Sequence, residues 1–186
     1  MSKITFGIGL GALSLTLLTS CVSTGTTTAP ASSPAATGVS SPTDTPGTSA
    51  PGGVPTYTMG QSVQVKNEDG AYTETVSQAH YTTKPGDQFS TPQHGGWLVA
   101  TVDIAVTSGH MSFNPLYFTL VGPDGSRWDV DLAAAGYKPD LSSGDLNAGE
   151  KTHGYIAFDA PSSATGPEAK IAATDVLLST VAYWSL

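Results

Sequence analysis

The feature that most restricts the fold of this chain is an alternating stretch in its second half, WLVATVDIAV, residues 97–106. Aliphatic residues recur there at every second position, at Leu98, Ala100, Val102, Ile104 and Val106. Successive side chains of a β-strand point to opposite faces, so a period of two predicts a long, half-buried strand. An amphipathic helix would instead need apolar residues three and four positions apart.

Shorter stretches of the same kind lie on both sides of it. The candidate strands are centred on Val63 and Val65, on residues 72–82, on Trp128, Val130 and Leu132, on Ile156 and Phe158, and on residues 179–184 with Val181 and Tyr183 on one side. Turn-forming residues separate them, at Asp69-Gly70, Pro123-Asp124-Gly125, Ala148-Gly149-Glu150 and Ala160-Pro161. No segment sustains a helical period, although residues 133–135 favour one helical turn. Seven or eight short strands predict an all-β protein, an antiparallel β-sandwich.

The N-terminus has the pattern of an export signal. Lys3 supplies a positive charge, and residues 4–18 form an apolar stretch shorter than the roughly 20 residues that a membrane-spanning helix needs. The small residues Thr19 and Ser20 follow, where a signal peptidase requires them. We therefore expect residues 1–20 to be a signal peptide.

The order Leu18-Thr19-Ser20-Cys21 resembles the lipobox of bacterial lipoproteins, in which an aliphatic residue and two small residues precede a cysteine. The resemblance implies that the Cys21 thiol carries a diacylglyceryl group, with acyl chains such as palmitate, and that the signal is cut just before it. The alternative is an ordinary signal peptide, which would leave the only cysteine unpaired in an oxidising compartment. Two acyl chains give stable membrane attachment, at about 0.8 kcal/mol for each buried methylene.

The composition changes abruptly after this signal. Of residues 22–55, 30 of 34 are Ser, Thr, Pro, Ala or Gly, which cannot bury enough apolar surface to fold. We expect residues 21–56 to be the lipidated cysteine and a disordered linker, either bare or O-glycosylated. Residues 57–186 have the composition of one globular domain, and lipidation of Cys21 would leave them no cysteine for a disulfide.

The domain resembles the immunoglobulin-like (telokin-like) module of unknown function found in many bacterial lipoproteins, which is similar to a small secreted immunogenic protein of mycobacteria. The matching features are the long strand WLVATVDIAV, the hairpin LVGPDGSRW at residues 120–128, the stretch LNAGEKTHGYIAFDAP at residues 146–161 and the terminal YWSL. The chain departs from the family at Thr107-Ser108-Gly109, where members have an asparagine that begins a turn. The resemblance implies an exported, non-enzymatic sandwich of immunoglobulin type, and it carries over no catalytic residue.

Acidic residues outnumber basic ones. The chain has 15 acidic and 7 basic residues, and removal of Lys3 with the signal would leave a net charge of 6 − 15 = −9. This charge argues against nucleic acid as a partner. Six carboxylates fall between residues 124 and 150, and Asp124, Asp129 and Asp131 are the candidate calcium ligands among them. No calcium-loop motif accompanies them, so we favour a solvated acidic face, and we expect no cofactor.

Signals of catalysis are weak. His80, His94, His110 and His153 lie too far apart for a paired zinc site, and we favour loop or solvated histidines over a dispersed metal site. No G-x-S-x-G or S-x-x-K motif is present. Glu68, Asp69 and Glu74 offer paired carboxylates for sugar chemistry, but they flank an apparent turn where we expect no cleft. We therefore expect that the protein is not an enzyme.

Aromatic residues mark a further candidate surface. Tyr81, Phe89, Phe113 and Tyr117 fall in or near predicted loops, where exposed aromatics often anchor partners. Trp97 lies on the face of its strand opposite Leu98, and either burial or binding would explain it.

Two functions from different classes remain open. The first is a non-enzymatic binding or adaptor module, held on the extracytoplasmic side of the cell membrane by Cys21, whose partner is an envelope protein or a cell-wall component. The second is a small-ligand or calcium-binding lipoprotein that uses the acidic region 124–150. A spacer or surface coat is a third hypothesis. Val22 follows Cys21, so an outer-membrane destination also stays open.

Overall fold

The computed structural model describes residues 53–186, so the predicted signal peptide, Cys21 and most of the predicted linker lie outside the described residues. This part of the chain contains ten strands and three short 3-10 helices. The strands are β1 (Thr56–Thr58), β2 (Ser62–Lys66), β3 (Gly70–Thr82), β4 (Trp97–Phe113), β5 (Phe118–Val121), β6 (Arg127–Asp131), β7 (Gly144–Asn147), β8 (Lys151–Asp159), β9 (Lys170–Thr174) and β10 (Thr180–Ser185). The 3-10 helices are η1 (Pro115–Tyr117), η2 (Ala134–Gly136) and η3 (Ser162–Thr165). Within residues 53–186, none of the helices has the length and apolarity to cross a membrane.

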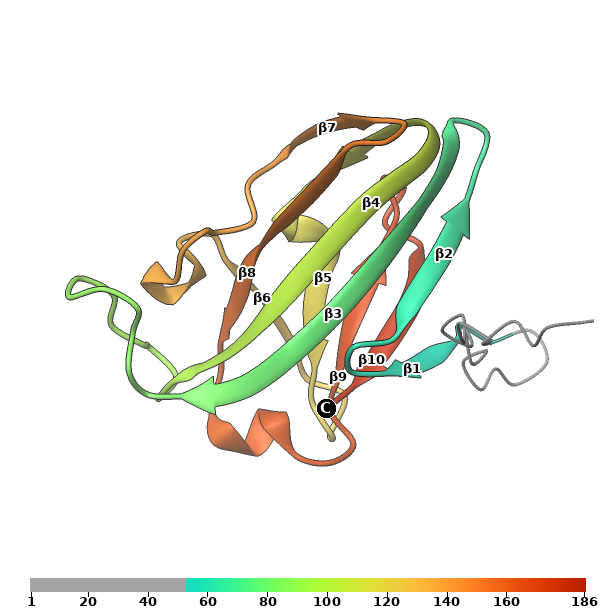
Figure 1. Cartoon of the computed structure of the whole chain (residues 1–186). Coiled ribbons are helices and arrows are strands. Elements are labelled where there is room, and N and C mark those ends of the chain that lie inside the picture. The colour runs from blue at the N-terminus through green and yellow to red at the C-terminus, as the bar shows by residue number, and fades with distance from the viewer. Residues whose placement is uncertain (1–52) are drawn as a thin grey trace, which may run out of the picture. The chain divides into compact units, whose positions relative to one another are not determined.

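The strands form two packed layers that share strand β6. One layer has the order β1-β10-β9-β5-β6, and the other has the order β6-β8-β4-β3-β2. Strand β6 joins them because Asp129 pairs with β5, whereas Val130 and Asp131 pair with β8. Figure 1 shows the layer of β2, β3, β4 and β8 in front of β5, β9 and β10. The predicted all-β sandwich is confirmed, and the short strands β1, β7 and β9 are additions that no sequence pattern indicated.

Strand β4 is the central element, and it is longer than the sequence suggested. It continues through Thr107-Ser108-Gly109, where the family pattern places a turn, and it pairs with β3, β8 and β7. Gly109 has a positive φ of 74°, which favours glycine, and a Cβ atom on it would overlap the carbonyl oxygen of Asp69. The backbones of β3 and β4 therefore approach closely at this end of the sandwich, because both contribute a glycine there (Gly70 and Gly109).

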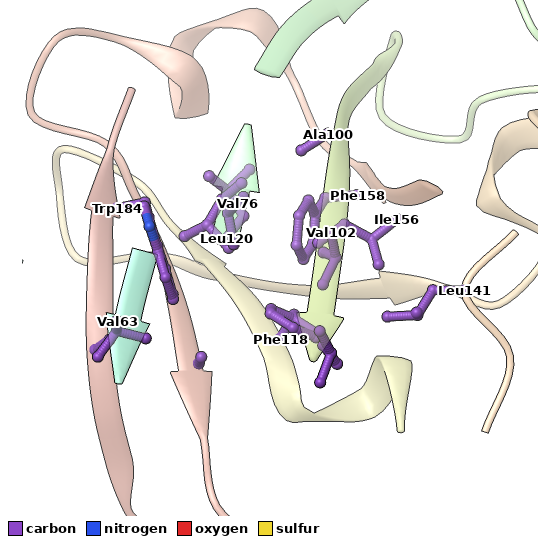
Figure 2. Packing of buried hydrophobic residues seen from close by; sticks show 14 of the residues in the cluster. Val63, Val76, Ala100, Val102, Phe118, Leu120, Leu141, Ile156, Phe158 and Trp184 are labelled. Atoms are coloured by element: carbon purple, nitrogen blue, oxygen red, sulfur yellow. The ribbon is translucent and has the colours of Figure 1, made fainter. Parts of the chain in front are cut away.

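The main core lies between the two layers. Figure 2 shows Val76, Leu120 and Trp184 meeting there, and each of these side chains is completely buried. Alternation in β3 and β4 sends every second side chain into this core, and burial of one large apolar side chain contributes about 1.5–3 kcal/mol. The indole nitrogen Nε1 of Trp184 donates a hydrogen bond to the carbonyl oxygen of Gln61 at 2.8 Å, so its polar atom is also satisfied.

A second, smaller cluster covers the outer face of β4. It contains Trp97, Val99, Ala135 and Ala157, and Ala135 comes from η2. Because this cluster buries the second face, residues 97–102 are all buried, and the prediction of a half-buried strand is wrong for that part of β4. Trp97 is only 1 % exposed, so of its two interpretations the structure selects the buried one.

Candidate functional site

A cavity opens at the end of the sandwich where β3 begins and β4 ends, the upper end in Figure 1. Its volume is about 100 Å³, which is room for a few water molecules or for the end of one side chain. The walls come from both layers: β3 and β4 on one side, and β5 with the end of β9 on the other. We call it the Glu74 cavity, after the residue that distinguishes it.

Glu74 is the unusual residue of this cavity. It lies on the inward face of β3 between Tyr72 and Val76 and is only 4 % exposed. Within residues 53–186, no hydrogen bond or ion pair to its carboxyl group is found. Burial raises the pKa of Glu74 from 4.5 to about 8. The side chain is therefore mostly a neutral carboxylic acid at pH 7, and it forms part of the cavity wall.

Two other acidic residues and a tyrosine also line this cavity. Asp69 from the β2–β3 turn and Asp175 from the loop after β9 both line the cavity. Burial raises the pKa of Tyr72, and the nearby carboxyl groups of Glu74 and Asp175 raise it further. Tyr72, Glu74 and Asp175 all line the cavity. None of the lining residues is Lys or Arg, and His110 is the one histidine among them.

Local hydrogen bonds hold the backbone segments that carry the two other acids, the exposed Asp69 and the partly buried Asp175. The Asn67 side-chain oxygen accepts hydrogen bonds from the backbone N–H groups of Asp69 and Gly70, each at 3.0 Å, which closes the β2–β3 turn. Asp175 accepts hydrogen bonds from the backbone N–H groups of Leu177 and Ser179, each at 2.9 Å. Neither set of turn hydrogen bonds involves Glu74.

The remaining walls are aromatic and aliphatic. Phe113 and Tyr117 line the cavity on either side of Asn114, whose side-chain oxygen accepts the backbone N–H of Leu116 and caps η1. Exposed apolar side chains also lie next to the cavity. The exposed large apolar residues that adjoin this mouth in the chain are Leu116, Val176, Leu177 and Leu178. The mouth thus combines acidic groups with an apolar surface.

The three predicted calcium candidates lie elsewhere. Asp124 is in the β5–β6 turn, where its carboxylate accepts the backbone N–H of Ser126 at 3.0 Å. Asp129 and Asp131 belong to β6, and Asp131 accepts the backbone N–H groups of Ala133 and Ala135. Among residues 53–186, no three His, Cys, Asp or Glu side chains gather as a metal site would require.

The histidines are placed separately. His94, His110 and His153 each face one carboxylate, of Asp159, Asp145 and Asp103, at 3.5, 3.6 and 2.8 Å respectively. His80 instead contacts the carbonyl oxygen of Gln78 at 3.2 Å. Only His110 also lines the Glu74 cavity.

Two carboxylates of the first hairpin lie at a cavity, which was not expected from the sequence. The expectation that they offer no cleft is wrong for Asp69 and Glu74, because both line the cavity, whereas Glu68 is exposed and does not. The sequence contained one signal of this arrangement: Glu74 has the same strand parity as Tyr72 and Val76. Of the four loop aromatics, Phe113 and Tyr117 come together at the cavity, whereas Phe89 is 82 % exposed in the β3–β4 loop.

Comparisons with known proteins bear on the fold. Residues 57–180 match the model of a family described as a domain of unknown function, DUF4352. The secreted protein MPT63 of Mycobacterium tuberculosis is similar in structure, with a TM-score of 0.57, 21 % identity and coverage of 73 % of this chain and 99 % of MPT63. This similarity supports the sandwich of immunoglobulin type.

Two further solved structures are less similar. The YjhA protein of Bacillus subtilis has a TM-score of 0.45 and 15 % identity, over 64 % of this chain and 81 % of YjhA. A β-sandwich protein of Clostridium difficile 630 has a TM-score of 0.44 and 12 % identity, over 70 % of this chain and 93 % of its own. A search of the curated proteins finds no match.

Proposed function

The chain belongs to the DUF4352 family, and we propose that it is a non-enzymatic binding module that holds one group of its ligand in the Glu74 cavity, on the extracytoplasmic side of the membrane. The observation that carries this proposal is the buried carboxyl group of Glu74, which faces the cavity without a partner. Within residues 53–186 no fully enclosed side-chain polar atom lacks a partner, so the carboxyl oxygens of Glu74 keep some contact with solvent. A buried acid that bonds to no other protein group is open to a ligand that bonds to it.

Recognition suits this geometry better than catalysis. General acid–base or nucleophilic catalysis requires two or more groups within hydrogen-bonding reach of each other and of the reacting atom. Within residues 53–186, Glu74 has no such partner, and the cavity holds only a small group.

The location follows from residues 1–21 rather than from the fold. The signal pattern and the lipobox-like Leu18-Thr19-Ser20-Cys21 support export and a lipid anchor on Cys21. MPT63, which has a similar fold, is itself named a secreted protein. The partner we propose is an envelope protein or a cell-wall component, reached through the linker of residues 21–56, and the acidic charge argues against nucleic acid.

Site-specific photo-crosslinking in cells tests this proposal. A photoreactive residue replaces Leu116, which is 54 % exposed and adjoins the cavity wall, or Phe89, which is exposed in the β3–β4 loop at the other end of β3. We expect one envelope component to be captured at position 116 and not at 89. Capture should disappear with Glu74→Gln and fall strongly with Cys21→Ala. Identical capture at both positions, or capture that ignores Glu74→Gln, would refute the proposal.

A further inference from the structure

We propose that the Glu74 cavity accepts one primary ammonium group at the end of a short alkyl chain, such as the end of a lysine side chain or of a free alkylamine. This inference rests on the proposed function and names the chemistry that the cavity recognises. Four features support it: the acidic charge of the cavity, the carboxyl group of Glu74 that bonds to no other residue, the aromatic and aliphatic side chains of the walls, and the cavity volume.

The charge of the cavity selects a cation. Its lining includes the carboxyl groups of Asp69, Glu74 and Asp175 and no Lys or Arg. The surplus of acidic residues in the whole chain, 15 against 7, adds a long-range field that attracts cations and repels anions. An anionic ligand would enter against this field, so we expect a cation rather than an anion to bind.

The buried carboxyl group provides the anchoring contact. Glu74 is 96 % removed from solvent and makes no hydrogen bond or ion pair with residues 53–186, so both oxygens are available to a ligand. Charge-assisted hydrogen bonds between an ammonium and a carboxylate are about twice as strong as neutral ones. The phenol oxygen of Tyr72, on the same face of β3, offers a further acceptor.

The walls suit the alkyl chain and the charge together. Phe113 and Tyr117 present aromatic rings, and a cation within about 6 Å of a ring centroid is attracted to its face. Ile104 and Met111 offer aliphatic surface for methylene groups. An ammonium group on a flexible apolar stem has this combination of a compact charge and a hydrocarbon chain.

The size of the cavity decides between the two common cationic side-chain ends. A volume of about 100 Å³ accommodates an ammonium group with a few methylenes. A guanidinium group is planar and carries five N–H donors that need partners arranged as a fork. The acids here lie on three separate segments, the β2–β3 turn, β3 and the loop after β9, and offer no paired carboxylate for such a fork.

Binding must displace a proton, which gives a specific readout. Glu74 keeps its proton to a pH of about 8 in the free protein, and an adjacent ammonium favours the ionised carboxylate. Binding at pH 6.5 therefore releases about one proton for each ligand, and binding at pH 9.5 releases almost none. The other titratable groups that face this space are Tyr72, from the same strand, and Asp69, His110, Tyr117 and Asp175 from the neighbouring elements.

Calorimetric titration of the full-length chain with n-propylammonium chloride tests the inference. Titrations at pH 6.5 in two buffers of different ionisation enthalpy measure the proton release directly. We expect saturable one-to-one binding, release of about one proton, and a loss of affinity of at least about 30-fold in Glu74→Gln. Glu68→Gln is the matched control, since it removes the same charge from the same hairpin but lies outside the cavity, and its affinity should change less than about twofold.

Further ligands separate cation recognition from other kinds of binding. Propionate and n-propanol match the size of the probe without its charge, and we expect neither to bind. Nα-acetyl-lysine-N-methylamide compares a lysine side chain with the free amine. Tighter binding of the lysine derivative would identify a protein side chain as the source of the ammonium group, whereas tighter binding of propylammonium would identify a small amine.

Several outcomes overturn the inference. Absence of propylammonium binding, equal affinity in Glu74→Gln, binding without proton release at pH 6.5, or equal affinity for propanol would each do so. The proposed function is tested separately by crosslinking at position 116. If crosslinking is Glu74-dependent while every amine fails to bind, the binding function stands and the ammonium chemistry falls.

Discussion

The buried Glu74 should make the stability of this protein fall as the pH rises from 5 to 8. In the unfolded chain the glutamate loses its proton near its ordinary pKa of 4.5, whereas in the folded domain burial holds the proton to a pH of about 8. Between these values the folded state binds more protons than the unfolded state, so raising the pH favours unfolding. The stabilising contribution is complete below pH 4.5 and is lost as the pH rises through 8.

The size of the effect follows from the same two pKa values. Each pH unit within the window changes the free energy of unfolding by about 1.4 kcal/mol for one proton, so the domain should lose about 3–4 kcal/mol between pH 5 and pH 8. That is a large share of the 5–15 kcal/mol that is typical of a folded domain. Glu74→Gln removes the ionisation and keeps the shape, so the variant should match the wild type near pH 5 and exceed it by about 3–4 kcal/mol at pH 8.

Urea unfolding of the full-length chain at pH 5, 6, 7 and 8 measures this directly. Fluorescence of the tryptophans reports unfolding, because Trp97 and Trp184 are buried in the folded domain. Glu68→Gln serves as the control, and its pH profile should follow the wild type. The exposed Asp87, Asp124 and Asp140 have lowered pKa values, so their effects appear on acidification below pH 4 and lie outside this window. A Glu74→Gln profile parallel to that of the wild type would refute the reasoning.

Three further predictions concern the fold and the calcium hypothesis. Gly109→Ala should destabilise the domain by at least about 3 kcal/mol in urea unfolding, because its Cβ would meet a facing backbone at positive φ; Gly149→Ala, which has a similar φ and open space, should cost only about 1–2 kcal/mol. Trp184→Phe should lower the free energy of unfolding, measured in urea, by about 2–4 kcal/mol, because it leaves a void and removes the hydrogen bond to Gln61. Trp128→Phe, at a half-buried site, should lower it less, and the reverse order would contradict the assigned core. Millimolar calcium should leave the melting temperature unchanged within about 1 °C, since the three candidate aspartates do not converge on one point; a calcium site at 100 times its dissociation constant would add about 2.7 kcal/mol and raise the melting temperature by several degrees.

Local patterns were enough to predict much of the fold. The period of two in residues 97–106 predicts a strand because it reflects the geometry of one segment, and turn residues such as Asp69-Gly70 act within four residues of chain. The all-β class follows from these patterns together. Strands β7 and β9 were not predicted because they are short, and β9 lies among alanines that carry little periodic signal.

The same pattern left the surroundings of each face undetermined. Leu132 continues the alternation of Trp128 and Val130, yet it follows the end of β6 and is 61 % exposed. Trp97 and Val99 lie on the side of β4 opposite the main core, and they are buried because η2 covers them. An alternating pattern shows which residues share a face of the strand, but it does not show what packs against that face.

The sequence by itself determined the positions of most strands, the turns, the acidic charge and the N-terminal pattern that predicts export and lipidation of Cys21. Only the tertiary structure decided that Glu74 is a buried acid facing a cavity. Its burial depends on β5 and the end of β9, which lie more than 40 residues away in the chain. An ionisable group takes its pKa and its chemistry from whatever surrounds it, and those surroundings exist only after distant strands have paired.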